Sequence, residues 1–229
     1  MSPWLAHPVG LSLVVAGAST VLLLPIGLLV GWGLARRRFF GKTIVETLVS
    51  VPLVLPPVVT GYLLLLLFGR QGLLGGWLQT AFGLELATTT AAAVMAAMVM
   101  ASPLMVGNAR LAFELVDPKL EEAAMTLRCG WPARFMRVTL PLAWPGISAG
   151  LALSFARSLG EFGATIVFAG NIPGETQTIP LAVYASLQRP AGEQQALLWA
   201  LWSVGISAAA LLASERFARR QAREGRRAR

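Results

Sequence analysis

The first apolar stretch of the chain, PVGLSLVVAGASTVLLLPIGLLVGWGLA at residues 8–35, contains no charged residue. A helix needs about 20 mostly apolar residues to cross the hydrocarbon core of a bilayer, so this stretch is long enough. Of the 229 residues, 55% are hydrophobic and only 13% are charged, whereas soluble domains contain about 25% charged residues. There are too few polar residues to cover the surface of a soluble protein. The sequence therefore predicts an integral membrane protein.

Further stretches of the chain are also long and apolar enough to cross a membrane. We expect an all-α fold with five transmembrane helices, at about residues 10–35, 47–69, 86–109, 144–170 and 194–214. The segment 176–188 is uncharged but too short and too polar to span, so we expect an external loop with a short surface helix. Because we find no internal repeat and no dividing linker, residues 1–229 are predicted to form a single transmembrane domain.

The basic residues predict the orientation of these helices. If the N-terminus is outside, the inner side carries 16 of the 19 lysines and arginines: four in residues 36–42, five in 110–137 and seven after Ser214. The outer side carries only Arg70 and Arg189. Cytoplasmic loops are enriched in Lys and Arg, so we predict an N-out, C-in, multi-pass protein of the cell (inner) membrane. The basic tail, residues 215–229, is then a topology signal that attracts anionic lipid rather than a nucleic-acid site.

The chain lacks the residues for enzymatic chemistry. One cysteine and one histidine exclude an intrachain disulfide and a histidine-based metal site. Gly41-Lys42-Thr43 resembles the end of a phosphate-binding loop, but Arg36 stands where that loop requires glycine. A cleaved signal peptide at the N-terminus is disfavoured because no basic residue precedes the first span and the apolar stretch is too long. We therefore predict no catalytic residue, no bound metal and no cofactor of the chain's own.

The inner loop at residues 110–143 is the one substantial segment expected on the cytoplasmic side. Asp117 and Pro118 favour the start of a helix, and Gly130 is suited to end that helix in a left-handed conformation. Small apolar residues then share one face of it: Leu120, Ala123, Ala124 and Leu127. Such a helix suits docking into a groove of another protein, and an amphipathic helix lying on lipid headgroups is the alternative.

Two motifs in this loop resemble the EAA loop of ABC-importer permease subunits. Glu122-Ala123-Ala124 is followed at the family's spacing by Val138-Thr139-Leu140-Pro141. The chain departs once, because Arg128 stands at the family's glycine position, and we expect Gly130 to take over the turn. The resemblance implies that the loop docks on an ATP-binding subunit. The coupling residues it implies are Glu121, Glu122, Ala123, Ala124, Gly130, Leu140 and Pro141.

Three further segments are similar to molybdate ABC-importer permeases: residues 51–69 (VPLVLPPVVTGYLLLLLFG), 155–165 (FARSLGEFGAT) and 171–180 (NIPGETQTIP). Sulfate/thiosulfate permeases are similar in the last two. The resemblance implies a type I ABC importer permease fold with cytoplasmic coupling helices. It also implies a homodimer, two copies of an ATP-binding subunit that uses ATP and Mg²⁺, and an extracytoplasmic molybdate-binding protein. Tungstate or sulfate/thiosulfate as substrate, and an ATP-independent secondary transporter, remain alternatives.

Polar residues and prolines inside the spans mark a candidate translocation pathway. Arg157 and Glu161 are spaced to share one helix face, either as part of an oxyanion route or as a structural ion pair, which we favour. Prolines in the second span predict a broken helix. This helix either lines the translocation pathway or is kinked without contacting the substrate. Neutral hydroxyls could contact an anion or bond neighbouring helices. The pathway candidates are Pro56, Pro57, Thr60, Ser154, Arg157, Ser158 and Glu161.

Overall fold

The computed structural model describes residues 7–227, with side chains up to residue 210. Within residues 7–227 the chain forms helices and turns, without any strand. The helices are α1 (Pro8–Arg36), α2 (Lys42–Val54), α3 (Pro57–Phe68), α4 (Leu73–Phe82), α5 (Thr90–Glu114), α6 (Pro118–Thr126), α7 (Trp131–Arg134), the π-helical turn η1 (Phe135–Thr139), α8 (Leu140–Leu159), α9 (Gly163–Phe168), α10 (Ile179–Leu187) and α11 (Glu193–Arg227).

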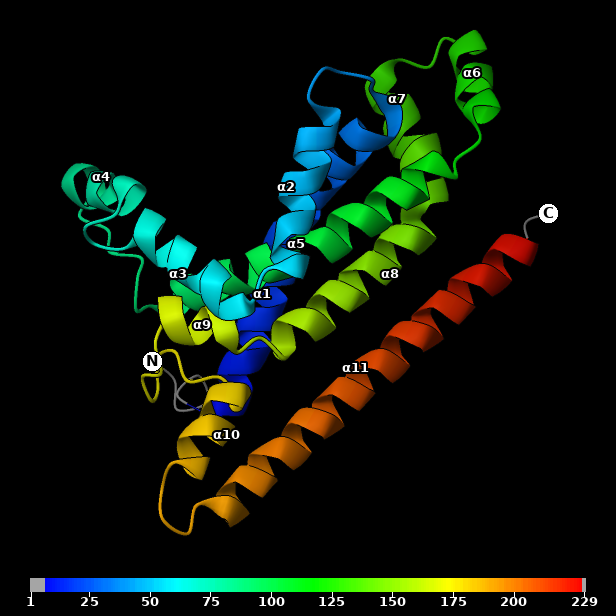
Figure 1. Cartoon of the computed structure of the whole chain (residues 1–229). Helices are drawn as coiled ribbons and strands as arrows, with labels where there is room; N and C mark the ends of the chain where they lie inside the picture. The colour runs from blue at the N-terminus through cyan, green and yellow to red at the C-terminus, as the bar shows by residue number, and fades with distance from the viewer. Residues whose placement is uncertain (1–6, 228–229) are drawn as a thin grey trace.

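The alanine-rich helix α5 is the centre of the fold, and α1 and α8 pack along it (Figure 1). Its small buried side chains let both neighbours approach closely. Glycines on the neighbours provide the other half of each contact: Gly31 of α1 faces Ala109, and Gly146 of α8 faces Ala112. Gly27 and Gly150, one turn away from Gly31 and Gly146, also face α5, at Met105 and Asn108.

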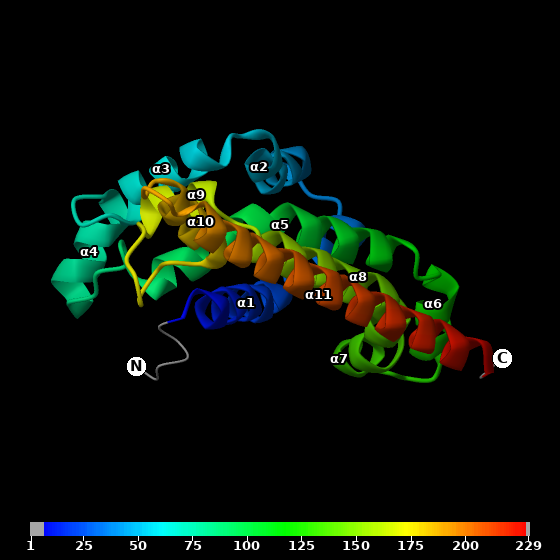
Figure 2. The same ribbon diagram turned by 90° about the horizontal axis from the view of Figure 1, so that it is seen from below.

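The short helices lie at two opposite ends of the molecule. Figures 1 and 2 show α6 and α7 at one end, and α9 and α10 with the start of α1 at the other. The long helix α11 begins beside α10 and runs along the outside, back toward the end that carries α6. The inner loop thus lies at the same end as the last residues of α1 and α5.

Three helices of the described chain are long and apolar enough to cross a membrane: α1, α5 and the continuous helix Trp131–Leu159. Helices α2 and α3 would together make a fourth span, but they are bent by 118°. The prediction of an all-helical membrane fold is confirmed, and the count of five spans stays a prediction. The α2–α3 break follows the prolines, since Pro56 precedes α3 and Pro57 begins it.

Helix α5 begins and ends later than its predicted span, 86–109. The side chain of Thr89 accepts a hydrogen bond from the Ala92 N–H at 3.2 Å and fixes the first turn at Thr90. At the other end, Arg110 and Glu114 pair at 2.8 Å, one turn apart. Because this pair satisfies both charges on the helix surface, the helix continues to Glu114.

The fourth predicted span, 144–170, is broken, so the expectation of one continuous helix there was wrong. Helix α8 ends at Leu159 and α9 starts at Gly163. The Glu161 carboxylate accepts a hydrogen bond from the Ala164 N–H at 2.8 Å and thereby caps α9. Glu161 thus starts a new helix instead of continuing the old one.

Helix α10 confirms a short helix in the segment 176–188, and it has one exposed face, with Tyr184 and Leu187, and one buried face. Ile179 and Leu181 are fully buried, and the Ile179 N–H donates to the Ser12 hydroxyl of α1 at 2.8 Å. The predicted last span, 194–214, falls within α11. For the predicted tail, 215–229, the backbone continues α11 to Arg227, whereas its side chains and residues 228–229 lie outside the described residues.

Candidate coupling loop and translocation site

The helix of the inner loop starts as its sequence predicts. Asp117 precedes α6, and its carboxylate accepts a hydrogen bond from the Lys119 N–H at 2.9 Å. Pro118 takes the first helical position, where its missing N–H costs nothing. The Asp-Pro pair therefore fixes the point at which the chain turns from the end of α5 into α6.

The helix ends differently from the prediction, because Arg128 and not Gly130 adopts the left-handed conformation. Arg128 has φ +56°, whereas Gly130 has φ −61° and ψ 160° and precedes α7. Left-handed backbone is available to glycine at little cost and to other residues only with strain. The backbone turn thus stays at the position where the EAA pattern has glycine, and the substitution by arginine does not move it to Gly130.

The apolar stripe of α6 is uncovered in this chain. Leu127 is 83% exposed and Leu120 is 48% exposed, and Glu122 and Ala123 are also exposed. Ala124 and Glu121 are partly buried. A nine-residue helix that, with the leucine directly after it, shows apolar side chains at the surface is suited to contact another chain.

The second half of the loop runs without interruption into α8. The segment consists of α7, η1 and the first turn of α8, which contains Leu140 and Pro141. Pro141 is exposed in the first turn of α8, where proline is tolerated. Thr139, directly before it, is only 2% exposed and donates a hydrogen bond to Glu121 at 2.7 Å. Motion of the loop would therefore pass directly into the backbone of α8.

The two broken helices meet at their breaks. A Cβ atom on Gly163, at the start of α9, would lie 2.7 Å from the Cβ of Pro57, at the start of α3. One on Gly61 would lie 2.6 Å from the carbonyl oxygen of Ala164. Only glycine permits so close an approach, and Figure 1 shows α3 and α9 side by side. Broken helices inside membrane proteins occur where the chain lines a cavity or is covered by protein.

Arg157 and Glu161 form an ion pair next to this contact, with 2.6 Å between Arg157 Nη1 and Glu161 Oε2. The side chain of Glu161 is 2% exposed, and that of Arg157 is 28% exposed. Since the same carboxylate also caps α9 through Ala164, both of its oxygens are engaged. The pair lies at the α8–α9 break, and its geometry is compatible with the structural interpretation that the sequence favours.

The neutral hydroxyls of the predicted pathway are buried inside the subunit. Thr60, Ser154 and Ser158 are 5%, 0% and 4% exposed, and none of the three hydroxyl oxygens has a hydrogen-bond partner in the described part of the chain. Thr60 lies at the α3–α9 contact, beside Gly61. Pro56 and Pro57 are exposed at the α2–α3 break. The structure thus brings Pro57, Thr60 and Glu161 to one region and leaves Ser154 within the helix packing.

Three residues make long-range hydrogen bonds that the sequence does not predict. Arg36, Thr139 and Ser12 contact segments far away in the chain, and such contacts leave no local pattern. Arg36 belongs to the basic segment 36–42, whose charges predict the orientation of the helices. Arg36 also bonds to Glu121 and to the carbonyl oxygen of Val116.

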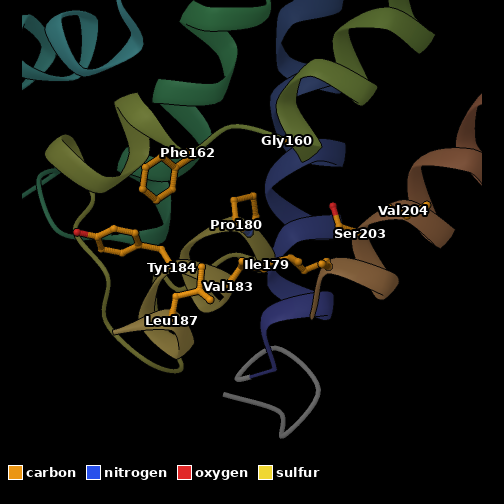
Figure 3. A pocket seen from close by; sticks show the side chains of 10 residues that line it. Gly160, Phe162, Ile179, Pro180, Val183, Tyr184, Leu187, Ser203 and Val204 are labelled. Atoms are coloured by element: carbon orange, nitrogen blue, oxygen red, sulfur yellow. The ribbon is translucent and has the colours of Figure 1, made fainter. Parts of the chain in front are cut away.

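An apolar groove of about 510 Å³ lies between α10 and α11, beside the end of α8 (Figure 3). It is lined by Gly160, Phe162, Ile179, Pro180, Val183, Tyr184, Leu187, Ala200, Ser203 and Val204. A doubly charged anion would find no charged partner among these residues. The groove is therefore not the candidate anion path.

The fold is shared with a chain of a solved transporter structure. A chain of the inward-facing MetNI methionine ABC transporter superposes on it with a TM-score of 0.70 at 18% identity, covering 96% of this chain and 99% of that one. This likeness shows that the two chains have the same helical fold.

The sequence comparisons then define the family. The family model described as binding-protein-dependent transport system inner membrane component matches residues 24–222, and the chain belongs to this family. It is 48% identical over 212 residues to the molybdenum transport system permease protein ModB of Haemophilus influenzae, covering 93% of each chain. It is 50% identical over 209 residues to the ModB of Escherichia coli (strain K12), covering 91% of each.

Proposed function

We propose that this chain is the membrane-spanning permease subunit of an ATP-driven molybdate importer. The observation that carries the proposal is the similarity over almost the whole chain to permeases of molybdenum transport. These relatives match 93% and 91% of the chain, and the family model spans residues 24–222, which include the inner loop, the two helix breaks and the outer loop before α10.

The uncovered helix α6 supports a partner on the inner side. In the proposed assembly, two copies of this chain form a homodimer, and each α6 docks on one of two ATP-binding subunits. ATP and Mg²⁺ are bound by those subunits, and this chain performs no hydrolysis. An extracytoplasmic binding protein delivers molybdate to the outer end. Closure of the ATP-binding subunits moves α6 and, through the continuous helix Trp131–Leu159, the membrane part.

The arrangement of the helices supports an N-out, C-in subunit with five spans. The basic residues at 36–42 and 110–137 belong to segments at the α6 end of the molecule, and α11 returns to that end. Cytoplasmic loops carry the excess of Lys and Arg, so the α6 end is assigned to the cytoplasm. The α2–α3 pair then counts as one broken span, and the apolar part of α11 as the fifth.

The meeting point of the broken helices is the proposed translocation route. Arg157 is the charged side chain there that keeps some exposure, while Glu161 is buried behind it. Alternating access would open this region first to one side and then to the other. Replacing Arg157 with Gln separates the two interpretations: loss of uptake in an assembled complex supports a route, whereas loss of assembly supports a purely structural pair.

The test is uptake of labelled molybdate by proteoliposomes that contain this chain and the co-expressed ATP-binding subunit, with the binding protein added outside. We expect uptake only when ATP and all three proteins are present. Uptake by this chain alone, driven by an ion gradient, would indicate a secondary transporter instead. Competition by unlabelled tungstate, sulfate and thiosulfate identifies the substrate. An anion that inhibits the uptake of labelled molybdate more strongly than unlabelled molybdate does would be the preferred substrate instead.

A further inference from the structure

Helix α6 is attached to the rest of the subunit by few contacts. No residue of α6 is buried within the part of the chain that the structure describes. A helix without a buried face has little apolar packing to hold it in place. Polar contacts must therefore fix the position of α6 relative to the membrane helices.

Glu121 makes these contacts. One oxygen of its carboxylate accepts hydrogen bonds from Arg36 Nη2 at 3.2 Å and from the Thr139 hydroxyl at 2.7 Å. Arg36 Nη2 also donates to the carbonyl oxygen of Val116 at 3.0 Å. The ends of α1 and α5, helix α6 and the turn before α8 thus meet at one carboxylate.

This polar contact is largely shielded from water. The side chains of Arg36 and Glu121 are 18% and 19% exposed, and Thr139 is buried. Charge-assisted hydrogen bonds in such a setting are stronger than an exposed surface pair. The contact is therefore able to hold α6 in one position.

Aromatic side chains form the wall beside it. The ring of Trp32 meets those of Trp131 and Phe135 at centroid distances of 5.5 and 6.2 Å, and Trp131 and Phe135 stack at 5.8 Å. These rings enclose a polar cavity of about 220 Å³ together with Arg36, Glu121, Arg134 and Thr139. The inner end of α1 is thus joined to α7 and η1 as well as to α6.

The two adjacent acids of α6 have different surroundings. Successive residues of a helix point about 100° apart, and Glu121 faces the subunit whereas Glu122 is exposed. Glu122 is therefore free to face a docking partner, while Glu121 is used within the chain.

We propose that Glu121 is a positioning residue that locks α6 to the inner ends of α1 and α8 through Arg36 and Thr139. Movement of α6 would then be passed to two membrane helices at once. Without the lock, α6 would be joined to the membrane helices only through the chain at its two ends, and α1 could stay in place when α6 moves. This inference rests on the proposed function, because it requires an ATP-binding subunit that moves α6.

The experiment compares variants of the assembled complex in proteoliposomes. Thr139→Val removes the hydroxyl and keeps the shape, whereas Thr139→Ser keeps the hydroxyl. Glu121→Gln removes the charge, and Arg36→Glu combined with Glu121→Arg reverses the pair. Arg38→Gln, on the exposed residue two positions after Arg36, is the matched charge control. Complex formation, ATP hydrolysis and molybdate uptake are measured for each.

We expect Thr139→Val and Glu121→Gln to assemble and hydrolyse ATP but to use about tenfold more ATP per molybdate imported, as loss of a charge-assisted hydrogen bond allows. Thr139→Ser and Arg38→Gln should match the wild type, and the reversed pair should recover part of the coupling lost in Glu121→Gln. An unchanged ratio in both Thr139→Val and Glu121→Gln would overturn the proposal. Failure of both variants to assemble would also overturn it, because the contact would then be needed for folding and not for coupling. Uptake by the wild-type complex is measured first, so a failure of the proposed function is recognised before any variant is compared.

Discussion

The close contact between α1 and α5 makes a quantitative prediction at Gly31. A Cβ atom at this position would lie 2.8 Å from the Cβ of Ala109 and 2.9 Å from the backbone nitrogen of Arg110. Ordinary contacts between carbon atoms are about 3.5–4.0 Å long, so the two helices would have to move apart. At Gly33, two residues further along α1, an added Cβ would meet nothing within 4 Å. Gly31→Ala and Gly33→Ala are therefore a matched pair.

The expected effects have opposite signs. Alanine favours a helix over glycine by about 1 kcal/mol, and Gly33→Ala should raise the free energy of unfolding by up to that amount. Overpacking costs about 1–3 kcal/mol, so Gly31→Ala should lower it by about 0–2 kcal/mol after the same helix gain. For a protein of this size, a change of 1 kcal/mol shifts Tm by about 2–4 °C. The two variants should differ by at least about 2 °C.

The measurement is the thermal unfolding of the purified permease in detergent, followed by tryptophan fluorescence. Equal stabilisation by both substitutions would refute the reasoning, because it would mean that α1 and α5 do not approach closely at Gly31. A fall in Tm for Gly33→Ala alone would contradict the open space beside Gly33. Gly107→Ala on α5, where an added Cβ also meets nothing, provides a second control.

Four further predictions follow from the same structure. Arg128→Val should lower stability by about 1–2 kcal/mol because a β-branched residue fits the left-handed backbone poorly, whereas Gly130→Ala should be neutral in thermal unfolding. Glu161→Ala should lower the free energy of unfolding by about 3 kcal/mol, since it leaves Arg157 unpaired. Glu161→Gln should lower it less, because the amide oxygen of glutamine still accepts the backbone N–H that caps α9. Thr176→Val should lower the free energy of unfolding by about 1–2 kcal/mol, because the Thr176 hydroxyl accepts a backbone hydrogen bond at 2.9 Å. Thr178→Val should leave it unchanged, because the buried Thr178 hydroxyl has no described partner. Calorimetry of the permease alone should detect no sub-micromolar molybdate binding, since a deep well in a pathway would hold the anion.

The helix breaks show how far local sequence determines this fold. The break before α3 was predictable, because Pro56 and Pro57 together remove backbone donors and restrict the preceding residue. The break before α9 was not predictable from the local sequence, since Arg157 and Glu161 have the spacing of a pair on one continuous helix. Their pairing was predicted correctly, but the helix does not extend between them. The carboxylate of Glu161 gains a second bond, to the Ala164 N–H, only if the chain turns.

The inner loop shows the same limit at longer range. Its helix start, apolar stripe and two glutamates were visible in the sequence, because caps and helical periodicity are local. Which glutamate faces inward depends on Arg36, which is 85 residues away from Glu121. The position of the left-handed turn was predicted wrongly for a different reason. Glycine is the usual residue there, but at Arg128 the fold imposes that conformation on a residue that does not prefer it.

The charges at the helix breaks determine how strongly the proposed pathway attracts an anion. Arg157 is paired within the chain, and Glu161 cancels its charge at 2.6 Å. The break thus presents a partly exposed guanidinium with a matched counter-charge behind it, which attracts an anion only weakly. Discrimination between tetrahedral dianions of similar shape needs polar groups fitted to one of them and left unpaired by the other. The hydroxyls of Thr60, Ser154 and Ser158 are buried and have no partner in the described part of the chain, so they are the neutral polar groups that an anion could meet only if the helices part. In the proposed importer, the matched ion pair therefore favours a shallow path for the anion, which opens when the partner moves α6.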